Sequence, residues 1–255
     1  MPTPSDRAAL APDDLALARS AMWEALALGF RPPTAETVAR LVSSEGARAL
    51  ADAAAGLDPA AGGGGLSALA LALAVRSSAT TAELGLAYGQ LFGHTARGAA
   101  PPYETEYGED SLWAPQREMS DLGGFFRAFG LRLDARARER PDHVACECEF
   151  LLVLARKEAR ALALGEQAMA EATARAARLF LRDHLGRWAP AFGTRLARLD
   201  GGGFYGALGR LLVGFVAGEC ARTGVAAGPR FLRLRSTEPD DTPAACGPAA
   251  AGPGS

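Results

Sequence analysis

The sequence predicts an all-α protein: a single-domain helical bundle of about ten helices with one long irregular loop. Three observations support this fold class. Apolar residues recur at the helical period in nearly every segment, and no segment alternates apolar and polar residues as a strand does. Glycine, proline and capping residues separate the periodic segments. The chain has 255 residues, which is long enough to bury a large core.

Five helices are expected before residue 93. Pro12 and the acidic residues after it begin the first helix, which the prolines at 32–33 end. A capping sequence at residues 34–37 opens the second helix. The other three are expected at the alanine-rich residues 45–61, at 66–75 and at about 80–92. The glycines at 62–65 form a flexible break, and no Lys-Ser or Lys-Thr pair follows them, so they do not form a phosphate-binding loop.

A long connection without helical periodicity is expected at residues 93–116, and five helices follow it. Their expected ranges are 117–130, 141–164, 166–186, 190–199 and 203–221. The end of the chain is rich in proline, alanine, glycine and aspartate, a composition typical of disorder. We therefore expect one helical domain at residues 1–235 and a disordered tail at residues 236–255.

Composition and charge exclude several classes of protein. The net charge is −2, so no global positive field attracts nucleic acid or an anionic membrane. The longest uncharged apolar stretch, residues 66–75, is about half as long as a membrane-spanning helix of ~20 residues. The N-terminus lacks the basic and apolar regions of a secretory signal. We expect a cytoplasmic protein that neither binds nucleic acid nor inserts into a membrane, with Cys146, Cys148 and Cys220 as buried free thiols.

Residues 101–110 form an acidic and aromatic part of the irregular connection. This segment contains Tyr103, Glu104 and Tyr107 among several carboxylates, and it has no basic residue. It is either a solvated acidic loop or a binding site for a cationic partner, since carboxylates accept paired bonds from arginine and tyrosine rings contact cations. Trp113 and Phe126 are close enough in sequence to add an apolar floor to such a site.

The second candidate site is the start of the helix expected at 141–164. Pro141 suits the first helical position, and Asp142 then lies in the first turn, where a negative charge favours the helix dipole. His143 and Glu147 are four residues apart and share a face different from the apolar stripe. The cluster is a helix cap with a surface salt link, a metal site, or the acid–base pair of a small helical hydrolase or other enzyme.

A metal site is the less favoured of these alternatives. Di-iron bundles carry the Glu-x-x-His pair on two helices, and no second copy of such a pair is found here. The His-Glu-x-x-His signature of zinc proteases is absent as well, and the chain has only three histidines. No nucleophile elbow of the Gly-x-Ser-x-Gly type occurs. We therefore predict no metal, no cofactor and no catalytic residue.

A third segment, residues 180–192, carries ring-bearing side chains at intervals of four. The row consists of Phe180, His184, Trp188 and Phe192. Residues at this spacing share one face of a helix, so we expect the row to pack in the core, with His184 at the edge of the core and Pro190 starting or kinking a helix.

These three segments together resemble the family of TorD-like chaperones, the TorD/DmsD/NarJ group. The first is Glu139-Arg140-Pro141-Asp142-His143 followed by Glu147-Cys148-Glu149-Phe150, the second is Pro-Pro-Tyr-Glu-Thr-Glu-Tyr-Gly at 101–108, and the third is Phe180, His184-Leu185, Trp188, Pro190 and Phe192. The resemblance covers roughly residues 80–200. Cys146 and Cys148 depart from it, because the family usually has aliphatic residues there.

The resemblance implies a cytoplasmic, all-helical protein that matures molybdenum oxidoreductases. Its partner would be the catalytic subunit of a molybdopterin-dependent oxidoreductase of the DMSO-reductase type, bound before cofactor loading, often through its N-terminal twin-arginine signal peptide. Such a peptide offers two guanidinium groups followed by an apolar helical run. We expect the binding residues to be Asp142 and His143 first, then Tyr103, Glu104, Tyr107, Glu147, Trp113 and Phe126.

Two functions of other classes remain as alternatives. A small enzyme using His143 and Glu147 would require the pKa of His143 to lie near neutrality in an enclosed pocket. A constitutive subunit of a larger complex would require a large exposed apolar face. A homodimer formed by helix exchange is compatible with the predicted architecture.

Overall fold

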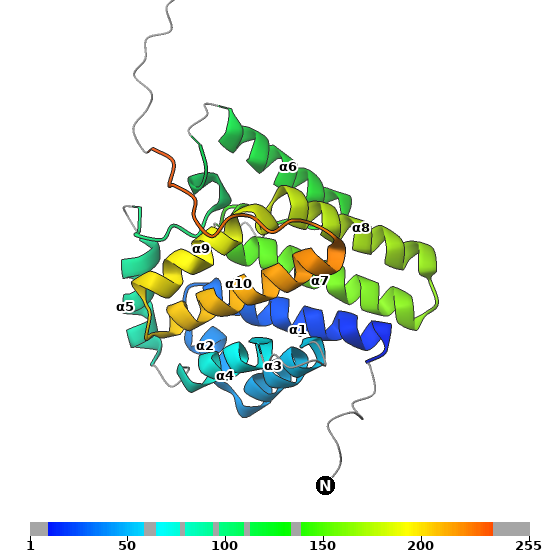
Figure 1. Ribbon diagram of the computed structural model, residues 1–255, viewed down its shortest axis with the longest axis horizontal. Helices are drawn as coiled ribbons and strands as arrows, with labels where there is room; N and C mark the ends of the chain where they lie inside the picture. The colour runs from blue at the N-terminus through cyan, green and yellow to red at the C-terminus, as the bar shows by residue number, and fades with distance from the viewer. Residues whose placement is uncertain are drawn as a thin grey trace, which may run out of the picture.

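The computed structural model describes residues 10–58, 65–76, 80–93, 97–109, 113–133 and 139–236. Within these ranges it contains ten α-helices and one short 3-10 helix, and its only extended pairing is two isolated β-bridges. The prediction of an all-α, single-domain protein is therefore confirmed (Figure 1).

The N-terminal half supplies five helices. They are α1 (Pro12–Phe30), α2 (Ala35–Val42), α3 (Ser44–Leu57), α4 (Gly65–Arg76) and α5 (Thr81–Phe92). Capping residues fix two of their starts: the Thr34 side chain accepts a hydrogen bond from the backbone N–H of Thr37, and Thr80 does the same for Glu83. The Glu83 carboxylate in turn accepts a hydrogen bond from the backbone N–H of Thr80, which completes a capping box.

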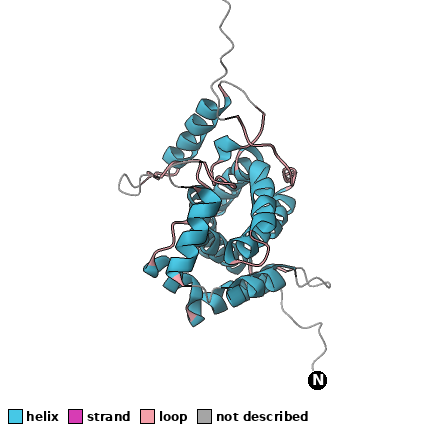
Figure 2. Ribbon diagram, turned by 90° about the vertical axis from the view of Figure 1, so that its left-hand side faces the viewer, coloured by secondary structure: helices cyan, strands magenta, loops and turns pink. Residues whose placement is uncertain are grey.

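The C-terminal half supplies five more helices and the 3-10 turn. They are η1 (Glu104–Glu106), α6 (Ala114–Ala128), α7 (Val144–Ala163), α8 (Gln167–Asp183), α9 (Leu185–Leu199) and α10 (Phe204–Thr223). Helix α7 packs on α1 and α8, and α9 packs on α10. In Figure 1, α2, α3 and α4 lie on one side of these central helices and α6 lies on the other, and Figure 2 shows the same arrangement nearly end-on.

One apolar cluster forms the core and draws residues from both halves of the chain. Trp23 of α1 contacts Phe215 of α10 with ring centroids 4.5 Å apart. The prediction that the row at residues 180–192 packs inside is confirmed, since all four members are buried. The prediction that Cys146, Cys148 and Cys220 are buried free thiols is also confirmed.

Helices α9 and α10 approach each other closely at two glycines. A Cβ added to Gly193 would lie 2.6 Å from the carbonyl oxygen of Gly209, and a Cβ on Gly209 would lie 2.6 Å from that of Gly193. Side chains at these positions would push the two backbones apart. Glycine therefore sets the separation of the two helices.

Three predicted helix starts were wrong, and the helix expected at 117–130 begins at Ala114. The helix expected at 141–164 begins at Val144, because Pro141 and Asp142 form a turn and His143 is the N-cap residue. The helix expected at 190–199 begins at Leu185, with Pro190 in its interior. Pro190 lacks the N–H that would bind the Gly186 carbonyl, and the backbone N–H of Gly228 binds that oxygen instead, at 2.8 Å. The later segment of the chain thus satisfies the group that proline leaves open.

Helix α10 is, among the described residues, the one helix long and apolar enough to cross a membrane, with a mean hydropathy of 1.2. Of that window 72% is buried inside the protein, and the core helix of a soluble protein passes the same test of length and composition. Core packing accounts for the apolar character of α10.

The predicted tail at residues 236–255 lies outside the described residues apart from Ser236, so the boundary at residue 235 stays a prediction.

Candidate functional site

The loop at residues 101–109 is joined by its backbone to the turn before α7. Tyr103 and His143 form an antiparallel β-bridge. The N–H of Glu104 donates to the carbonyl of Asp142 at 2.9 Å, and the N–H of Val144 donates to that of Pro102 at 2.8 Å. Two of the three segments that the sequence singled out therefore form one structural unit.

Asp142 is the polar centre of this unit, and its side chain is completely buried. Its Oδ2 accepts hydrogen bonds from the Thr105 hydroxyl and from Nη2 of Arg140, each at 2.7 Å, and its Oδ1 accepts one from Nε of Arg140 at 3.0 Å. The Arg140 guanidinium also covers the Tyr103 ring, 4.5 Å from its centroid. Asp142 thus ties the loop to the turn, and it does not lie in the first turn of α7 as expected.

His143 is buried and caps α7. Its Nδ1 accepts a hydrogen bond from the N–H of Ala145 at 3.1 Å, and its Nε2 has no hydrogen-bond partner among the described residues. Burial, together with the nearby charges of Arg140 and Arg31, lowers the pKa of His143 to about 3. The imidazole is therefore neutral near pH 7, which does not fit the acid–base role that the enzyme alternative requires.

Glu147 lies one turn into α7 and is also completely buried, so the expectation of a shared exposed face for His143 and Glu147 was wrong. Its Oε1 accepts a hydrogen bond from Nε1 of Trp188 at 3.2 Å. Burial raises the pKa of the Glu147 carboxyl well above its usual value. The Tyr107 ring packs against Trp188, with centroids 5.3 Å apart. This contact joins the third predicted segment to the other two.

His184 links three elements at the junction of α8 and α9. Its Nδ1 lies 2.9 Å from Oε2 of Glu104 in η1, and its Nε2 lies 3.1 Å from Oδ2 of Asp121 in α6. Burial alone would lower the pKa of His184, but the hydrogen bonds and charges of the two carboxylates outweigh this effect and raise it. Burial raises the pKa of Glu104, and the bond to His184 opposes that rise.

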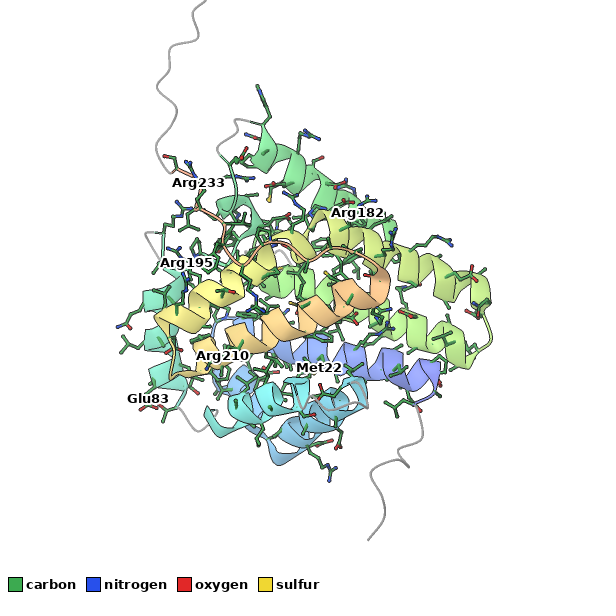
Figure 3. The ribbon with its side chains drawn as sticks, in the orientation of Figure 1. Met22, Glu83, Arg182, Arg195, Arg210 and Arg233 are labelled. Carbon is green, nitrogen blue, oxygen red and sulfur yellow. The ribbon has the colours of Figure 1, made fainter. Side chains whose placement is uncertain are left out.

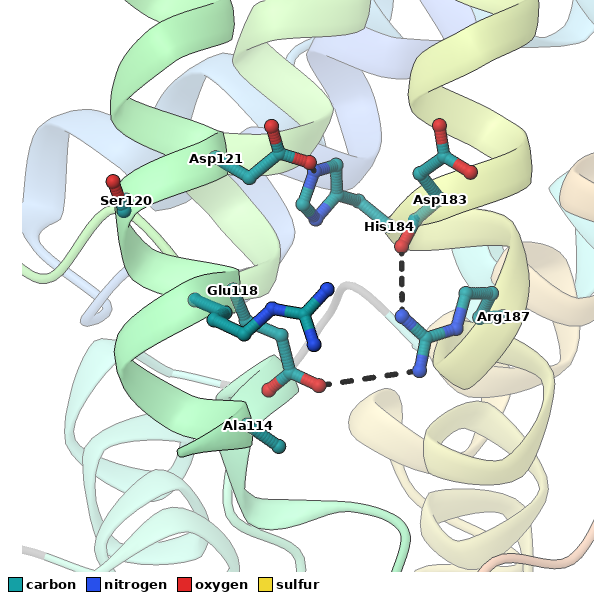
Figure 4. A pocket seen from close by; sticks show the side chains of 8 residues that line it. Ala114, Glu118, Ser120, Asp121, Asp183, His184 and Arg187 are labelled. Atoms are coloured by element: carbon teal, nitrogen blue, oxygen red, sulfur yellow. Dashed lines mark hydrogen bonds and ion pairs between the residues drawn. The ribbon is translucent and has the colours of Figure 1, made fainter. Parts of the chain in front are cut away.

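A polar cavity of about 750 Å³ opens beside this link, between α6 and the α8–α9 junction (Figure 4). Its lining residues are Ala114, Arg117, Glu118, Ser120, Asp121, Asp183, His184 and Arg187. Arg187 donates to the carbonyl of Asp183 at 2.9 Å and lies 3.9 Å from Oε1 of Glu118. The carboxylates of Glu118, Asp121 and Asp183 share this cavity with the basic side chains of Arg117 and Arg187, so its lining carries both signs of charge.

An apolar groove of about 280 Å³ lies near the other end of α6. Its lining is mostly aliphatic and aromatic, and consists of Phe126, Leu131, Arg132, Leu133, Cys146, Glu149, Phe150, Leu152 and Val153. Phe126 therefore borders an open apolar surface although most of its ring is buried. Helix α6 separates a polar cavity from an apolar groove.

The predicted binding residues differ in how far a partner could reach them. Trp113 is 72% exposed and Tyr103 is half-buried, whereas the side chains of Glu104, Tyr107, Asp142, His143 and Glu147 are buried. The structure brings most of these residues together around the loop, but as an internal network. Direct contact between the buried members and a partner stays a prediction.

Sequence reasoning missed several residues of the site. Glu118, Asp121 and Arg187 line the cavity, and Arg235 lies beside it, yet none was singled out. His184 was expected only as a core-edge residue. The four-residue spacing of His184 from Phe180 could have indicated its place in the site. The isolated charged residues of α6 form no pattern that could have done so. Among the described residues, no group of three or more His, Cys, Asp or Glu side chains is placed to hold a metal ion.

The sequence model of the family described as the nitrate reductase delta subunit matches residues 49–194. This chain belongs to that family. The predicted resemblance to TorD-like chaperones is confirmed, and the match begins earlier in the chain than the expected range of 80–200. The matched region contains the 101–109 loop, the turn before α7, the polar cavity and the apolar groove.

Curated relatives of the family agree with this assignment. The chain is 31% identical over 136 residues to the chaperone protein TorD of Vibrio cholerae serotype O1, a match covering 52% of this chain and 59% of the relative. It is 40% identical over 82 residues to the selenate reductase assembly chaperone protein of Thauera selenatis, covering 32% and 42%. It is 41% identical over 78 residues to the chlorate reductase assembly chaperone protein of Ideonella dechloratans, covering 31% and 39%. The chain thus spans 59% of the TorD relative's length.

Proposed function

We propose that this protein is a cytoplasmic assembly chaperone that binds the catalytic subunit of a molybdopterin-dependent reductase before its cofactor is loaded. The observation that carries the proposal is the family match over residues 49–194, together with relatives named as assembly chaperones of selenate and chlorate reductases. The buried His143, whose pKa is lowered to about 3, does not fit the acid–base role of the enzyme alternative.

The two open surfaces beside α6 fit the chemistry of a twin-arginine signal peptide on that subunit. The cavity carboxylates now pair with Arg235, His184 and Arg182, and they would exchange these partners for the guanidinium groups of the peptide. The apolar groove would take the apolar run that follows them. In this arrangement Trp113 and Tyr103 contact the peptide. The buried Asp142, His143, Glu104 and Glu147 hold the loop in place, Tyr107 packs on Trp188, and Phe126 borders the apolar groove.

Capture from native cytoplasm tests the proposed function. The tagged full chain is expected to retain a molybdopterin-type catalytic subunit, identified by mass spectrometry, and to retain more of it when cofactor synthesis is blocked. Absence of such a subunit in extracts where the reductase is expressed would contradict the proposal. Size measurement of the purified chain in the same work reports whether it forms a homodimer.

A Trp113→Ala variant tests the site. Trp113 is exposed and starts α6 beside the cavity, and a large aromatic residue at the centre of an interface commonly contributes ~2 kcal/mol or more. We expect capture of the reductase subunit to weaken by about tenfold or more. Leu86→Ala on α5 is the matched control, since Leu86 is 67% exposed and does not line the cavity. An equal loss of capture in both variants would show that Trp113 is not part of the binding site.

A further inference from the structure

The chain continues past α10 as an extended segment, residues 225–236, which we call the strap. It leaves the helix at Gly224, whose φ of 67° is left-handed, and it runs back over the α8–α9 side of the molecule (Figure 1). Its end pairs with the 101–109 loop: Leu234 and Tyr107 form an antiparallel bridge. The N–H of Gly108 donates to the Arg233 carbonyl at 3.1 Å, and the N–H of Arg235 donates to the Glu106 carbonyl at 2.9 Å.

The Arg235 side chain fills a complete arginine-binding site. Its Nη1 and Nη2 bind the two oxygens of Glu118 at 2.8 and 2.9 Å. Nη1 also donates to the carbonyl of Thr105 at 2.8 Å, and Nε donates to the carbonyl of Glu109 at 3.1 Å. A paired carboxylate and two carbonyls satisfy the fork of guanidinium donors, which is the geometry by which proteins select arginine over lysine.

The rest of the strap is partly buried: Val225, Leu232 and Leu234 pack against the core cluster, and the N–H of Gly228 binds the Gly186 carbonyl. Arg235, which is 9% exposed, is its only buried residue, and the others are half-buried or exposed. Phe231 lies on the surface under the Arg198 guanidinium. Figure 3 places Arg233 on the same side of the molecule as Arg195, which binds the Ala99 carbonyl just before the loop. A segment without a fully buried apolar side chain opens at a lower free-energy cost than the core helices do.

The site lies inside the family-matched region, and its occupant lies outside it. Thr105, Glu109 and Glu118 lie within the family-matched residues 49–194, whereas the strap lies outside them. Glu118 also lines the polar cavity, so the site opens directly onto a space that holds the Asp121 and Asp183 carboxylates. A longer peptide bound at Glu118 would extend into this space, which Arg117 and Arg187 also line.

We propose that Glu118 and the carbonyls of Thr105 and Glu109 form an arginine-binding site for an extended peptide segment of the client, and that the strap occupies this site until the client displaces it. The inference rests on the proposed function and names the contact by which the client is recognised. An incoming segment pairs its backbone with residues 106–108, as the strap does, and places an arginine against Glu118.

Competition between strap and client makes binding depend on how often the strap is released. The apparent dissociation constant equals the intrinsic one divided by the fraction of molecules with an open site. Weakening the strap without altering Glu118 therefore tightens binding in trans. This dependence would not arise if the strap were a permanent part of the fold.

The first experiment measures binding of a fluorescent peptide with the sequence of residues 229–236 to full-length variants. Loss of the paired charged bonds in Arg235→Gln is expected to tighten peptide binding by about tenfold or more relative to wild type. Arg230→Gln is the matched control, since it removes the same charge from an exposed strap position, and we expect it to bind as wild type does. Adding Glu118→Gln to Arg235→Gln should abolish the gain. A peptide with glutamine in place of its last arginine should bind none of these variants.

The second experiment uses unaltered protein, so that it does not depend on the folding of any variant. Hydrogen exchange is followed at the N–H groups of Arg235 and Gly108 with saturating peptide. Displacement leaves the Arg235 N–H of the strap exposed, while Gly108 stays protected because the peptide carbonyl replaces that of Arg233. Protection of both groups at every peptide concentration, or equal peptide binding by wild type and Arg235→Gln, overturns the proposal.

Neither experiment contains a reductase, so their outcome is independent of the proposed function. Peptide exchange without capture of a reductase subunit would support the arginine-binding site and contradict the proposal that the client is a reductase subunit. Capture of the subunit without peptide exchange would support the chaperone function and contradict recognition of the client through the arginine-binding site.

Discussion

At the scale of single residues, Asp142 and His143 are notable because their polar groups are used inside the protein. Asp142 has all its bonds to Thr105 and Arg140, and His143 accepts a bond from the helix that it precedes. Both side chains are buried, so their hydrogen bonds are internal and hold the 101–109 loop and the start of α7 in position. A residue type that suggests a reactive group from sequence can therefore act as a positioning residue in the fold.

The lowered pKa of His143 makes stability sensitive to acid. The folded protein keeps the imidazole neutral down to a pKa of about 3, whereas the unfolded chain binds a proton near its ordinary pKa of ~6.5. The neutral His143 imidazole therefore makes its full contribution to the free energy of unfolding above about pH 6.5, and this contribution is lost progressively as the pH falls towards about 3. Between about pH 6.5 and 5, wild type should lose about 2 kcal/mol more of its free energy of unfolding than His143→Asn does.

Asparagine is chosen for this comparison because it caps helices and does not titrate. Urea denaturation of both proteins at several pH values measures the difference. Parallel pH profiles for wild type and His143→Asn would show that the imidazole titrates normally in the folded state.

At the scale of secondary-structure elements, packing decided where several helices begin and how closely they pass. Helix α7 begins at Val144 because Asp142 is bound to the loop, and α9 continues through Pro190 because Gly228 takes the open carbonyl of Gly186. Helices α9 and α10 meet at Gly193 and Gly209 with no space for a methyl group.

A pair of glycine-to-alanine substitutions tests that close approach. Gly193→Ala should lower the free energy of unfolding by about 1–3 kcal/mol, because the new methyl group meets the Gly209 backbone. Gly218→Ala in α10 should raise it by about 0.5–1 kcal/mol, since a Cβ there meets no atom within 4 Å and alanine favours the helix. Denaturant unfolding measures both changes. A Gly193→Ala variant as stable as wild type would show that the two helices can separate without cost.

At the scale of the whole molecule, one core cluster includes residues from both halves of the chain, and the polar network joins η1, α6 and the α8–α9 junction across it. The candidate site is assembled from segments far apart in the chain, such as those of Glu104 and His184, which are 80 positions apart. Its geometry therefore depends on the integrity of the entire bundle.

A single core predicts a single cooperative unfolding transition. Far-ultraviolet circular dichroism reports the helices, and tryptophan fluorescence reports the buried Trp23 in α1 and Trp188 in α9. The two signals should give the same denaturant midpoint. Separate midpoints would mean that the N-terminal helices form an independent unit.

The sequence by itself determined the fold class, most helix ranges and the family, because helical periodicity, capping residues and the three motifs are local features of the chain. It also indicated which segments form the site. Only the tertiary structure decided that Glu104, Asp142, His143 and Glu147 are buried, that His184 lies between Glu104 and Asp121, and that Arg235 binds Glu118. Burial and pairing between distant segments depend on how helices pack in space, and no local pattern of residues encodes that packing.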